Sequence, residues 1–106
     1  MFARNVSIHL KPNMLSDYTR TFENEILPLL RKQKGFRDEI TFVGSTGTEA
    51  FGISLWDTQE SADAYNRGTY TEVTKFLAGV VEGTPKVDTY TLANSTCHKI
   101  AVAVAA

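Results

Sequence analysis

The fold of this chain is decided by the stretch Glu49-Ala-Phe-Gly-Ile-Ser-Leu-Trp56, which runs directly into Asp57-Thr-Gln-Glu-Ser-Ala-Asp-Ala-Tyr65. In the first half, Phe51, Ile53 and Leu55 alternate with smaller residues, which is the period of a β-strand with one buried face. The second half opens with residues that cap helices. Together they predict a strand that ends at a large aromatic residue and a helix that begins just after it.

The predicted helix has two candidate capping residues, Asp57 and Thr58. Glu60 or Ser61 stands three residues after them, which is the spacing of a capping box. Apolar residues at helical spacing then continue as far as residue 83, interrupted at residues 66–68. We therefore expect two helical pieces, or one bent helix, between the capping residues and a stop at the following proline.

The rest of the chain is read in the same way. The apolar periods predict strands and a long helix over residues 2–10 (strand), 14–34 (helix), 38–44 (strand) and 86–93 (strand). Pro28 lies inside the helical pattern, so a kink or a break is expected just before it. Gly35 suits the left-handed position after a helix. A turn at residues 45–48 is expected to join two strands into a hairpin.

The predicted order is strand, helix, strand, strand, helix, strand. This is the split β-α-β order of a ferredoxin-like fold, an α+β class whose two helices lie on one face of an antiparallel sheet. We expect the other face to be semi-apolar and to carry Ala3, Asn5, Ser7, His9, Gly52, Ser54 and Trp56. A domain this small buries such a face best against its own copy, so the pattern predicts a homodimer with two sheets packed face to face.

The composition limits the classes of function. A chain of 106 residues is one domain, and 11 basic against 12 acidic residues leave a net charge of −1 without a basic stripe. Nucleic acid is therefore not an expected partner. The longest apolar stretch, residues 100–106, is far shorter than the roughly 20 residues that span a bilayer. With a single cysteine and no signal-peptide pattern, we expect a cytoplasmic protein that does not bind membranes.

Residues 97–106 form a tail outside the predicted domain of residues 1–96. The tail alternates β-branched residues with alanine, which predicts an extra C-terminal strand. That strand needs a sheet edge, which lies either in its own subunit or on the dimer partner. Cys97 stands next to His98, but two ligand types with no third nearby predict no metal site.

The whole pattern resembles the antibiotic biosynthesis monooxygenase-like branch of the dimeric α/β-barrel superfamily, over roughly residues 2–93. The resemblance is carried by Ile26-Leu-Pro-Leu-Leu-Arg-Lys-Gln-Lys-Gly-Phe36 before a strand, and by Phe51-Gly-Ile-Ser-Leu-Trp56 before Glu60, Ala62 and Tyr65. It implies a ferredoxin-like fold in a dimeric α/β barrel. It also implies a small aromatic or polyketide-like molecule as ligand and chemistry without a cofactor.

The chain departs from two better-defined members of this branch. Gly52 and Ala62 stand where the quinone-forming oxygenases that share the tryptophan tend to carry an asparagine and a tyrosine. Lys75 stands where the haem-degrading members carry the histidine that binds iron. An ammonium group has no lone pair for iron, so haem degradation is not expected.

Three residues of the predicted sheet have both a chemical and a structural interpretation. His9, the only histidine inside the predicted domain, is either a general base toward a phenolic or enolic substrate or a polar residue at the dimer face. Trp56 either stacks on a planar ligand or fills the core or interface. Arg4 interrupts an apolar face, and it either holds an anionic substrate or extends to solvent.

The second helical region offers hydroxyl and amide groups near the expected cleft between helices and sheet. Tyr65 and Tyr70 flank an irregular segment, and such segments often rim pockets. The alternative is ordinary packing with the hydroxyls in solvent. Asn5 matches an asparagine that haem-degrading members carry near the first strand. The candidate catalytic residues are therefore His9, Tyr65 and Tyr70, and the candidate ligand-binding residues are Asn5, Trp56, Asn66 and Tyr90.

Two functions remain open at this point. The first is a homodimer that binds a small planar organic molecule in the cleft and oxygenates or isomerises it without metal or flavin, with a histidine or tyrosine as proton acceptor. The second is a non-catalytic dimer that acts as a ligand-binding or scaffolding module. A pocket of roughly 300 Å³ or more favours a ligand site. A cleft packed shut by phenylalanine side chains favours the scaffold.

Overall fold

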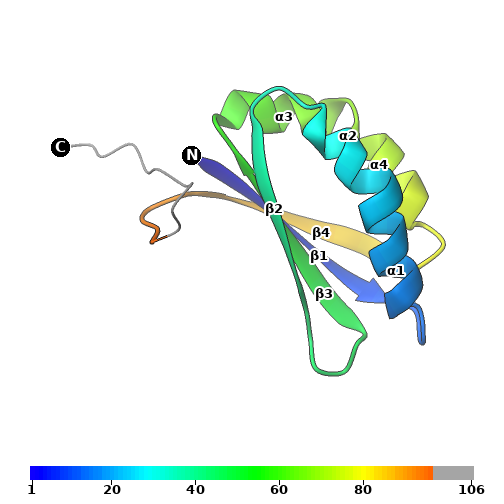
Figure 1. Cartoon of the computed structure of the whole chain (residues 1–106). Coiled ribbons are helices and arrows are strands. Elements are labelled where there is room, and N and C mark those ends of the chain that lie inside the picture. The colour runs from blue at the N-terminus through cyan, green and yellow to red at the C-terminus, as the bar shows by residue number, and fades with distance from the viewer. Residues whose placement is uncertain (97–106) are drawn as a thin grey trace.

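The computed structural model describes residues 1–96, in which all helices lie on one face of a four-stranded sheet (Figure 1). The elements are β1 (Phe2–Leu10), α1 (Leu15–Thr21), the π-helical turn η1 (Phe22–Ile26), α2 (Leu27–Arg31), β2 (Phe36–Val43), β3 (Glu49–Trp56), α3 (Gln59–Arg67), α4 (Tyr70–Leu77) and β4 (Val81–Thr91). The predicted tail strand lies outside the described residues, and the division into residues 1–96 and 97–106 stays a prediction.

The sheet confirms the ferredoxin-like prediction. Its strand order is β2-β3-β1-β4, and every pair of neighbouring strands is antiparallel. The two strands that follow the helical regions, β2 and β4, are therefore the two edges. No helix within residues 1–96 is long and apolar enough to cross a bilayer.

The first helical region breaks where Pro28 predicts it. The backbone N–H of Leu27 donates to the carbonyl of Phe22, five residues earlier, which is the hydrogen bond of a π-helical turn. Pro28 follows directly within the helical region, and because it has no N–H to donate to the preceding turn it accounts for the widened winding there. The region ends at Arg31 rather than at residue 34. Gly35 has the expected positive φ, at 80°.

The second helical region consists of two separate helices, α3 and α4, which confirms the first of the two alternatives, two pieces rather than one bent helix. The predicted continuation of the helix to residue 83 is wrong, because α4 ends at Leu77 and β4 begins at Val81. Val81 is buried as a strand residue, which is why its spacing resembled a helix face. Pro85 lies inside β4, where the pairing with β1 shifts register between Ser7 and His9. An edge strand with an irregularity tolerates proline, since no ladder hydrogen bond is lost there.

The predicted orientation of β3 is also wrong. Arg4 and Val6 of β1 pair with Ser54 and Gly52, and all four line the space under the helices. Side chains alternate along a strand, so Gly52, Ser54 and Trp56 face the helices and the apolar residues between them face away. Both faces of β3 carry apolar residues, so the period alone did not decide which face is covered. Trp56 is completely buried in the helix-facing core.

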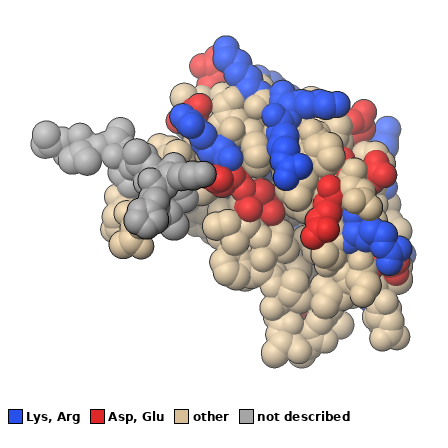
Figure 2. Space-filling model, in the orientation of Figure 1, with Lys and Arg blue, Asp and Glu red and all other residues tan. Residues whose placement is uncertain are grey.

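The sheet face without helices is more apolar than the sequence led us to expect. Ile40, Phe42 and Phe51 lie on it and are 42%, 49% and 40% exposed. The rings of Phe42 and Phe51 stack across β2 and β3 with centroids 5.1 Å apart. Figure 2 shows that charged side chains gather over the helices in this view, while the surface at the β2–β3 hairpin carries almost none. We call Ile40, Phe42, Phe51 and Ile53 the open-face patch.

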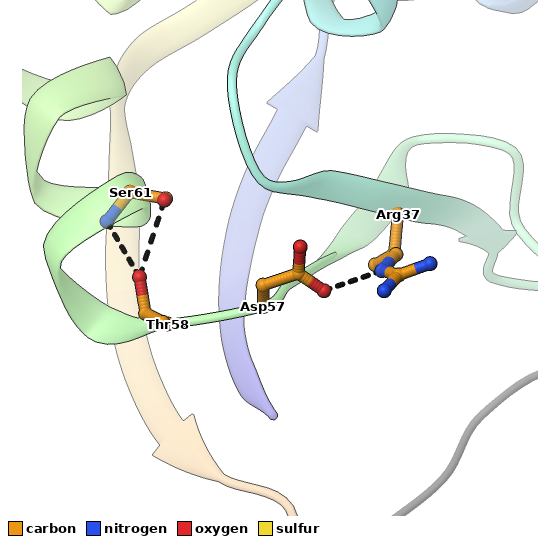
Figure 3. A network of polar contacts seen from close by, with 4 residues as sticks. All are labelled: Arg37, Asp57, Thr58 and Ser61. Atoms are coloured by element: carbon orange, nitrogen blue, oxygen red, sulfur yellow. Dashed lines mark hydrogen bonds and ion pairs between the residues drawn. The ribbon is translucent and has the colours of Figure 1, made fainter.

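The joint between β3 and α3 is held by polar contacts (Figure 3). Thr58 is the N-cap of α3 and its hydroxyl accepts from the backbone N–H of Ser61 at 3.1 Å, which confirms one of the two predicted caps. Asp57 instead forms an ion pair with Arg37 of β2. The N–H of Asp57 also donates to the carbonyl of Gly35 at 2.8 Å, so the joint is tied to the segment before β2.

We predict that Gly35→Ala destabilises the fold while Gly79→Ala does not. Gly35 has φ +80°, and a Cβ there would lie 2.4 Å from the Ser61 hydroxyl, whereas a Cβ at Gly79 would meet nothing within 4 Å. Left-handed backbone alone costs about 1–2 kcal/mol for a residue with a Cβ. Urea unfolding of the two variants measures the difference, and equal midpoints would contradict the strain assigned to Gly35.

Candidate functional site

A small cavity of about 40 Å³ lies between the helices and the covered face of the sheet. Its walls are mostly apolar, with Val6, Ile8 and Phe22 among them. A space of this size holds about one or two water molecules, so it is well below the roughly 300 Å³ of a drug-sized pocket. The groups that give the cavity its chemistry are few: Arg4, Tyr18, Glu39, Ser54, Tyr65 and Tyr70.

Arg4 is a buried cation at the end of this cavity. The side chain is 3% exposed, and its Nη2 donates to Asn66 Oδ1 at 2.9 Å. The guanidinium carbon lies 4.5 Å from the ring centroid of Tyr70 and 5.0 Å from that of Tyr65. Within residues 1–96 no carboxylate forms an ion pair with it. A desolvated guanidinium on two aromatic faces is suited to bind an anionic oxygen.

The two tyrosines beside Arg4 are hydrogen-bond donors at neutral pH. Burial raises the pKa of Tyr65 to about 12, although the nearby Arg4 acts in the opposite direction. Burial likewise raises the pKa of Tyr70, again against the effect of Arg4. Both hydroxyls therefore keep their protons near pH 7, and they stabilise a bound oxygen anion better than they accept a proton.

Glu39 of β2 is the carboxylate of the cavity. Its Oε2 accepts a hydrogen bond from the hydroxyl of Thr41 at 2.7 Å, and burial raises the pKa of Glu39 above its ordinary value. Gly52 gives the carboxylate its space, because a Cβ at that position would lie 2.8 Å from Glu39 Oε2. The glycine that departs from the oxygenase pattern is thus the residue that accommodates Glu39.

Three polar residues form a row across the sheet beneath the helices. Arg4 pairs with Ser54, and Ser54 pairs with Glu39, so the three lie side by side on β1, β3 and β2. Neighbouring strands are about 4.8 Å apart, which places the backbones of Arg4 and Glu39 about 10 Å from each other. Ser54 between them accepts from the indole Nε1 of Trp56 at 2.9 Å, which satisfies both buried groups.

A wider cleft adjoins the cavity. It has a volume of about 250 Å³ and lies at the surface between the first helical region and β2. Tyr18, Phe22 and Glu39 line both the cleft and the cavity. These three side chains therefore stand between the buried space and the solvent, and Glu39 faces both.

The structure brings together some of the candidate residues and separates others. Tyr65, Asn66 and Tyr70 surround Arg4, as the break between α3 and α4 led us to expect. Trp56 lies below them in the core, with its ring 5.0 Å from that of Tyr65. On the opposite face of the sheet lie Asn5, His9 and Tyr90.

The residues on the opposite face have different surroundings. His9 is mostly exposed, and its Nε2 lies 3.8 Å from a carboxylate oxygen of Glu49. Tyr90 is 55% exposed. The Oδ1 atom of Asn5 is buried and has no hydrogen-bond partner among residues 1–96. The structure therefore does not place His9 within reach of the tyrosines around Arg4.

The sequence allowed Arg4 either to hold an anionic substrate or to extend to solvent, and it did not identify Glu39 as a candidate site residue. The signal for Arg4 was its interruption of an apolar strand face. The signal for Glu39 was weaker: it alternates with Asp38, so one of the two carboxylates had to face the helices. No group of three or more metal-ligating side chains lies together within the described part of the chain.

Solved structures with this architecture include named monooxygenases. The monooxygenase from the gene ActVA-Orf6 of Streptomyces coelicolor, solved in complex with the ligand nanaomycin D, has a TM-score of 0.75 at 15% identity, over 91% of this chain and 90% of that one. A structure named antibiotic biosynthesis monooxygenase has a TM-score of 0.70 at 12% identity, over 89% of this chain and 100% of the other.

A third similar structure has no assigned activity. The NE2512 protein of unknown function from Nitrosomonas europaea has a TM-score of 0.74 at 13% identity, over 91% of this chain and 92% of that one. No family model and no curated protein matches the chain. The likeness therefore establishes the fold, which is the ferredoxin-like fold of the antibiotic biosynthesis monooxygenase structures.

We predict that Glu39→Gln becomes more stable than the wild type as the pH rises. Burial raises the pKa of Glu39 above 4.5, so the folded state holds this proton more tightly than the unfolded state. The resulting stabilisation is present below the unfolded pKa and is lost as the pH rises through the folded pKa. Thr41 of β2 donates a hydrogen bond to Glu39, the charge of Glu39 acts on Tyr18 of α1 and Tyr65 of α3, and Arg4 of β1 lines the same cavity.

Urea unfolding between about pH 4 and pH 7 measures this difference, with the same substitution at the exposed Glu25 as control. The stability of Glu39→Gln relative to the wild type should increase across this range, while that of Glu25→Gln should stay constant. A constant difference for Glu39→Gln as well would mean that the carboxylate is not buried as described.

Proposed function

We propose that this protein is a homodimer that binds a small planar organic molecule with an acidic oxygen between its helices and sheet, and oxygenates it without a cofactor. The observation that carries the proposal is the buried Arg4, which lies over two tyrosine rings without a carboxylate partner in residues 1–96. Burying an unpaired cation is costly, and an anionic ligand offsets that cost.

The surroundings of Arg4 favour an aromatic ligand. The walls are apolar apart from the groups named above, and Tyr65 and Tyr70 offer donors from protonated hydroxyls. The cavity alone is too small for an aromatic ring. We propose that Phe22, which lines both this cavity and the adjoining cleft of about 250 Å³, moves outward and joins the two spaces when a ligand binds. Phe22 belongs to the π-helical turn, a kind of element often found at functional sites.

The reaction we propose needs no external reductant. A phenolate held at Arg4 is electron-rich, and a phenol with a free para position reacts with O₂ to give a para-quinone and water. The ring supplies all four electrons, and one oxygen atom stays on the para carbon. The other oxygen atom leaves as water, together with the two hydrogens that the phenol loses from its hydroxyl and its para carbon. Arg4 holds the phenolate oxygen, and Tyr65 and Tyr70 donate hydrogen bonds to oxygen anions that form nearby. The likeness of the fold to named monooxygenases supports this class of reaction.

A non-catalytic dimer is the second candidate, and one observation favours it. The cavity has about 40 Å³, and Phe22 closes part of it. Gly52 and Ala62 also replace the polar pair that the resemblance associates with oxygenation. On this alternative Arg4 is a structural cation that holds the α3–α4 break in place.

The open-face patch supports the homodimer under either candidate. Its residues lie on the sheet face opposite the helices, and three of them are at least 40% exposed. Asn5, next to this patch, keeps a buried Oδ1 without a partner in the described chain. A second copy packed on this face would remove the patch from water and supply a donor for Asn5. His9 and Tyr90 would then face the partner subunit.

We predict that Arg4→Met abolishes binding and oxidation of 1-naphthol, a phenol with a free para position. The substitution keeps an unbranched apolar side chain in place of the arginine stem but removes the cation that holds the phenolate. Quenching of Trp56 fluorescence measures binding, and an oxygen electrode with product analysis measures one O₂ consumed per 1,4-naphthoquinone.

The matched control for this test is Arg31→Met, at an exposed position on α2. It should bind and oxidise 1-naphthol as the wild type does. Binding without oxygen uptake in the wild type would favour the non-catalytic candidate. Saturable binding that survives in Arg4→Met would overturn the proposed site.

We predict that Phe51→Arg dissociates the dimer and that Phe76→Arg does not. Both phenylalanines are 40% exposed, but Phe51 belongs to the open-face patch and Phe76 to α4 on the other side of the sheet. A buried unpaired charge at the interface costs several kcal/mol. Sedimentation equilibrium reports the mass of each variant. A wild-type protein that sediments as a monomer at micromolar concentration would contradict the dimer.

A further inference from the structure

The row Arg4–Ser54–Glu39 places a cation and a carboxylate at opposite ends of one line across the sheet. Arg4 and Glu39 do not form an ion pair with each other, because Ser54 of β3 stands between them. Both side chains line the same cavity. A pair of opposite charges that share an apolar cavity and remain apart is placed to hold the two ends of a ligand once Phe22 moves outward, as the proposed function requires.

The chemistry of the two ends differs. Arg4 has only donors and takes an anionic oxygen. Glu39 already accepts one hydrogen bond from Thr41, and its carboxylate retains further acceptor sites. An ionised carboxylate repels a second anion and has no donor of its own. The group that fits Glu39 is therefore a hydroxyl, which donates its proton into a hydrogen bond.

Gly52 contributes to the space that the Glu39 carboxylate occupies. Gly52 on the neighbouring strand leaves open the volume that Oε2 occupies, since any Cβ there would lie 2.8 Å from that atom. Glu39 also lines the adjoining cleft together with Tyr18 and Phe22. It therefore stands at the point where a ligand that enters through the cleft first reaches the cavity.

We infer that Glu39 is a specificity-determining residue that selects ligands with a hydroxyl at the end opposite the acidic group held by Arg4. The ligand class is a planar aromatic with a second hydroxyl on the far side of the ring system from the oxygen held by Arg4, and with the carbon para to that oxygen unsubstituted, as the proposed oxygenation requires. 4-Hydroxybenzoate carries an acidic group and a hydroxyl at opposite ends and serves as a binding probe for this recognition. The inference rests on the proposed function, because it needs the ligand to bind at Arg4. It adds to that proposal a second contact at the other end of the ligand, in which Glu39 accepts a hydrogen bond from the ligand's hydroxyl.

Isothermal titration calorimetry with three benzoates tests this inference on the full chain. 4-Hydroxybenzoate carries the carboxylate and the hydroxyl, benzoate lacks the hydroxyl, and 4-methoxybenzoate replaces it with a group that cannot donate. We expect the wild type to bind 4-hydroxybenzoate about tenfold more tightly than the other two, as a hydrogen bond to a charged acceptor would give. Glu39→Ala should bind all three with the affinity that the wild type has for benzoate.

Three further variants make the result specific. Glu39→Gln, which keeps the side-chain shape and a neutral acceptor, should retain part of the preference, and it serves if Glu39→Ala does not fold. Glu49→Ala removes an exposed carboxylate from the opposite face of the sheet and should keep the full preference. Arg4→Met should lose affinity for all three benzoates.

The outcomes distinguish a failure of the assignment of Glu39 from a failure of the ligand site at Arg4. If all benzoates bind through Arg4 with equal affinity, or if the hydroxyl preference persists in Glu39→Ala, the assignment of Glu39 is overturned and the Arg4 site stands. If no benzoate binds the wild type, the proposed ligand site itself fails and the assignment of Glu39 falls with it.

Discussion

The structure depends on the burial of one guanidinium group. Arg4 lies in the central part of the sheet, where a charge without a partner is costly, and its surroundings are arranged to satisfy it. Asn66 supplies an acceptor, and the rings of Tyr65 and Tyr70 supply aromatic faces. These residues reach Arg4 because the chain breaks between α3 and α4, which turns two successive helices toward the same point. A continuous helix would carry Tyr65 and Tyr70 onto different faces.

The sheet accommodates this arrangement through small residues on its covered face. Gly52 and Ser54 lie under the helices on β3, and the larger apolar residues between them face the other way. This has two linked effects. The covered face gains space for the side chains of Arg4 and Glu39, and the uncovered face carries exposed apolar side chains. The polar site and the apolar patch are thus two sides of one alternating strand.

Much of the fold could be predicted from the sequence, because alternation, capping and proline position are local signals. The break before Pro28, the Thr58 cap and the two pieces of the second helical region follow from such signals. The orientation of β3 could not be predicted, since both of its faces carry apolar residues and tertiary packing chose between them. The cluster of Tyr65, Asn66 and Tyr70 was visible as an irregular segment. Its partner Arg4, 62 positions before Asn66, became visible only through the strand pairing.

The π-helical turn before Pro28 inserts one extra residue into the winding of the first helical region. Each residue of an α-helix turns by roughly 100°, so this insertion offsets the two halves of the region by that angle. Tyr18 and Phe22 are thereby directed to the boundary between cavity and cleft, while Ile26 and Leu30 remain in the core. A shortening of the chain by a single residue at this turn would return the region to regular winding. The aromatic wall of the cleft would then rotate away from Glu39. The shape of the cleft therefore depends on the number of residues in this segment as well as on its composition.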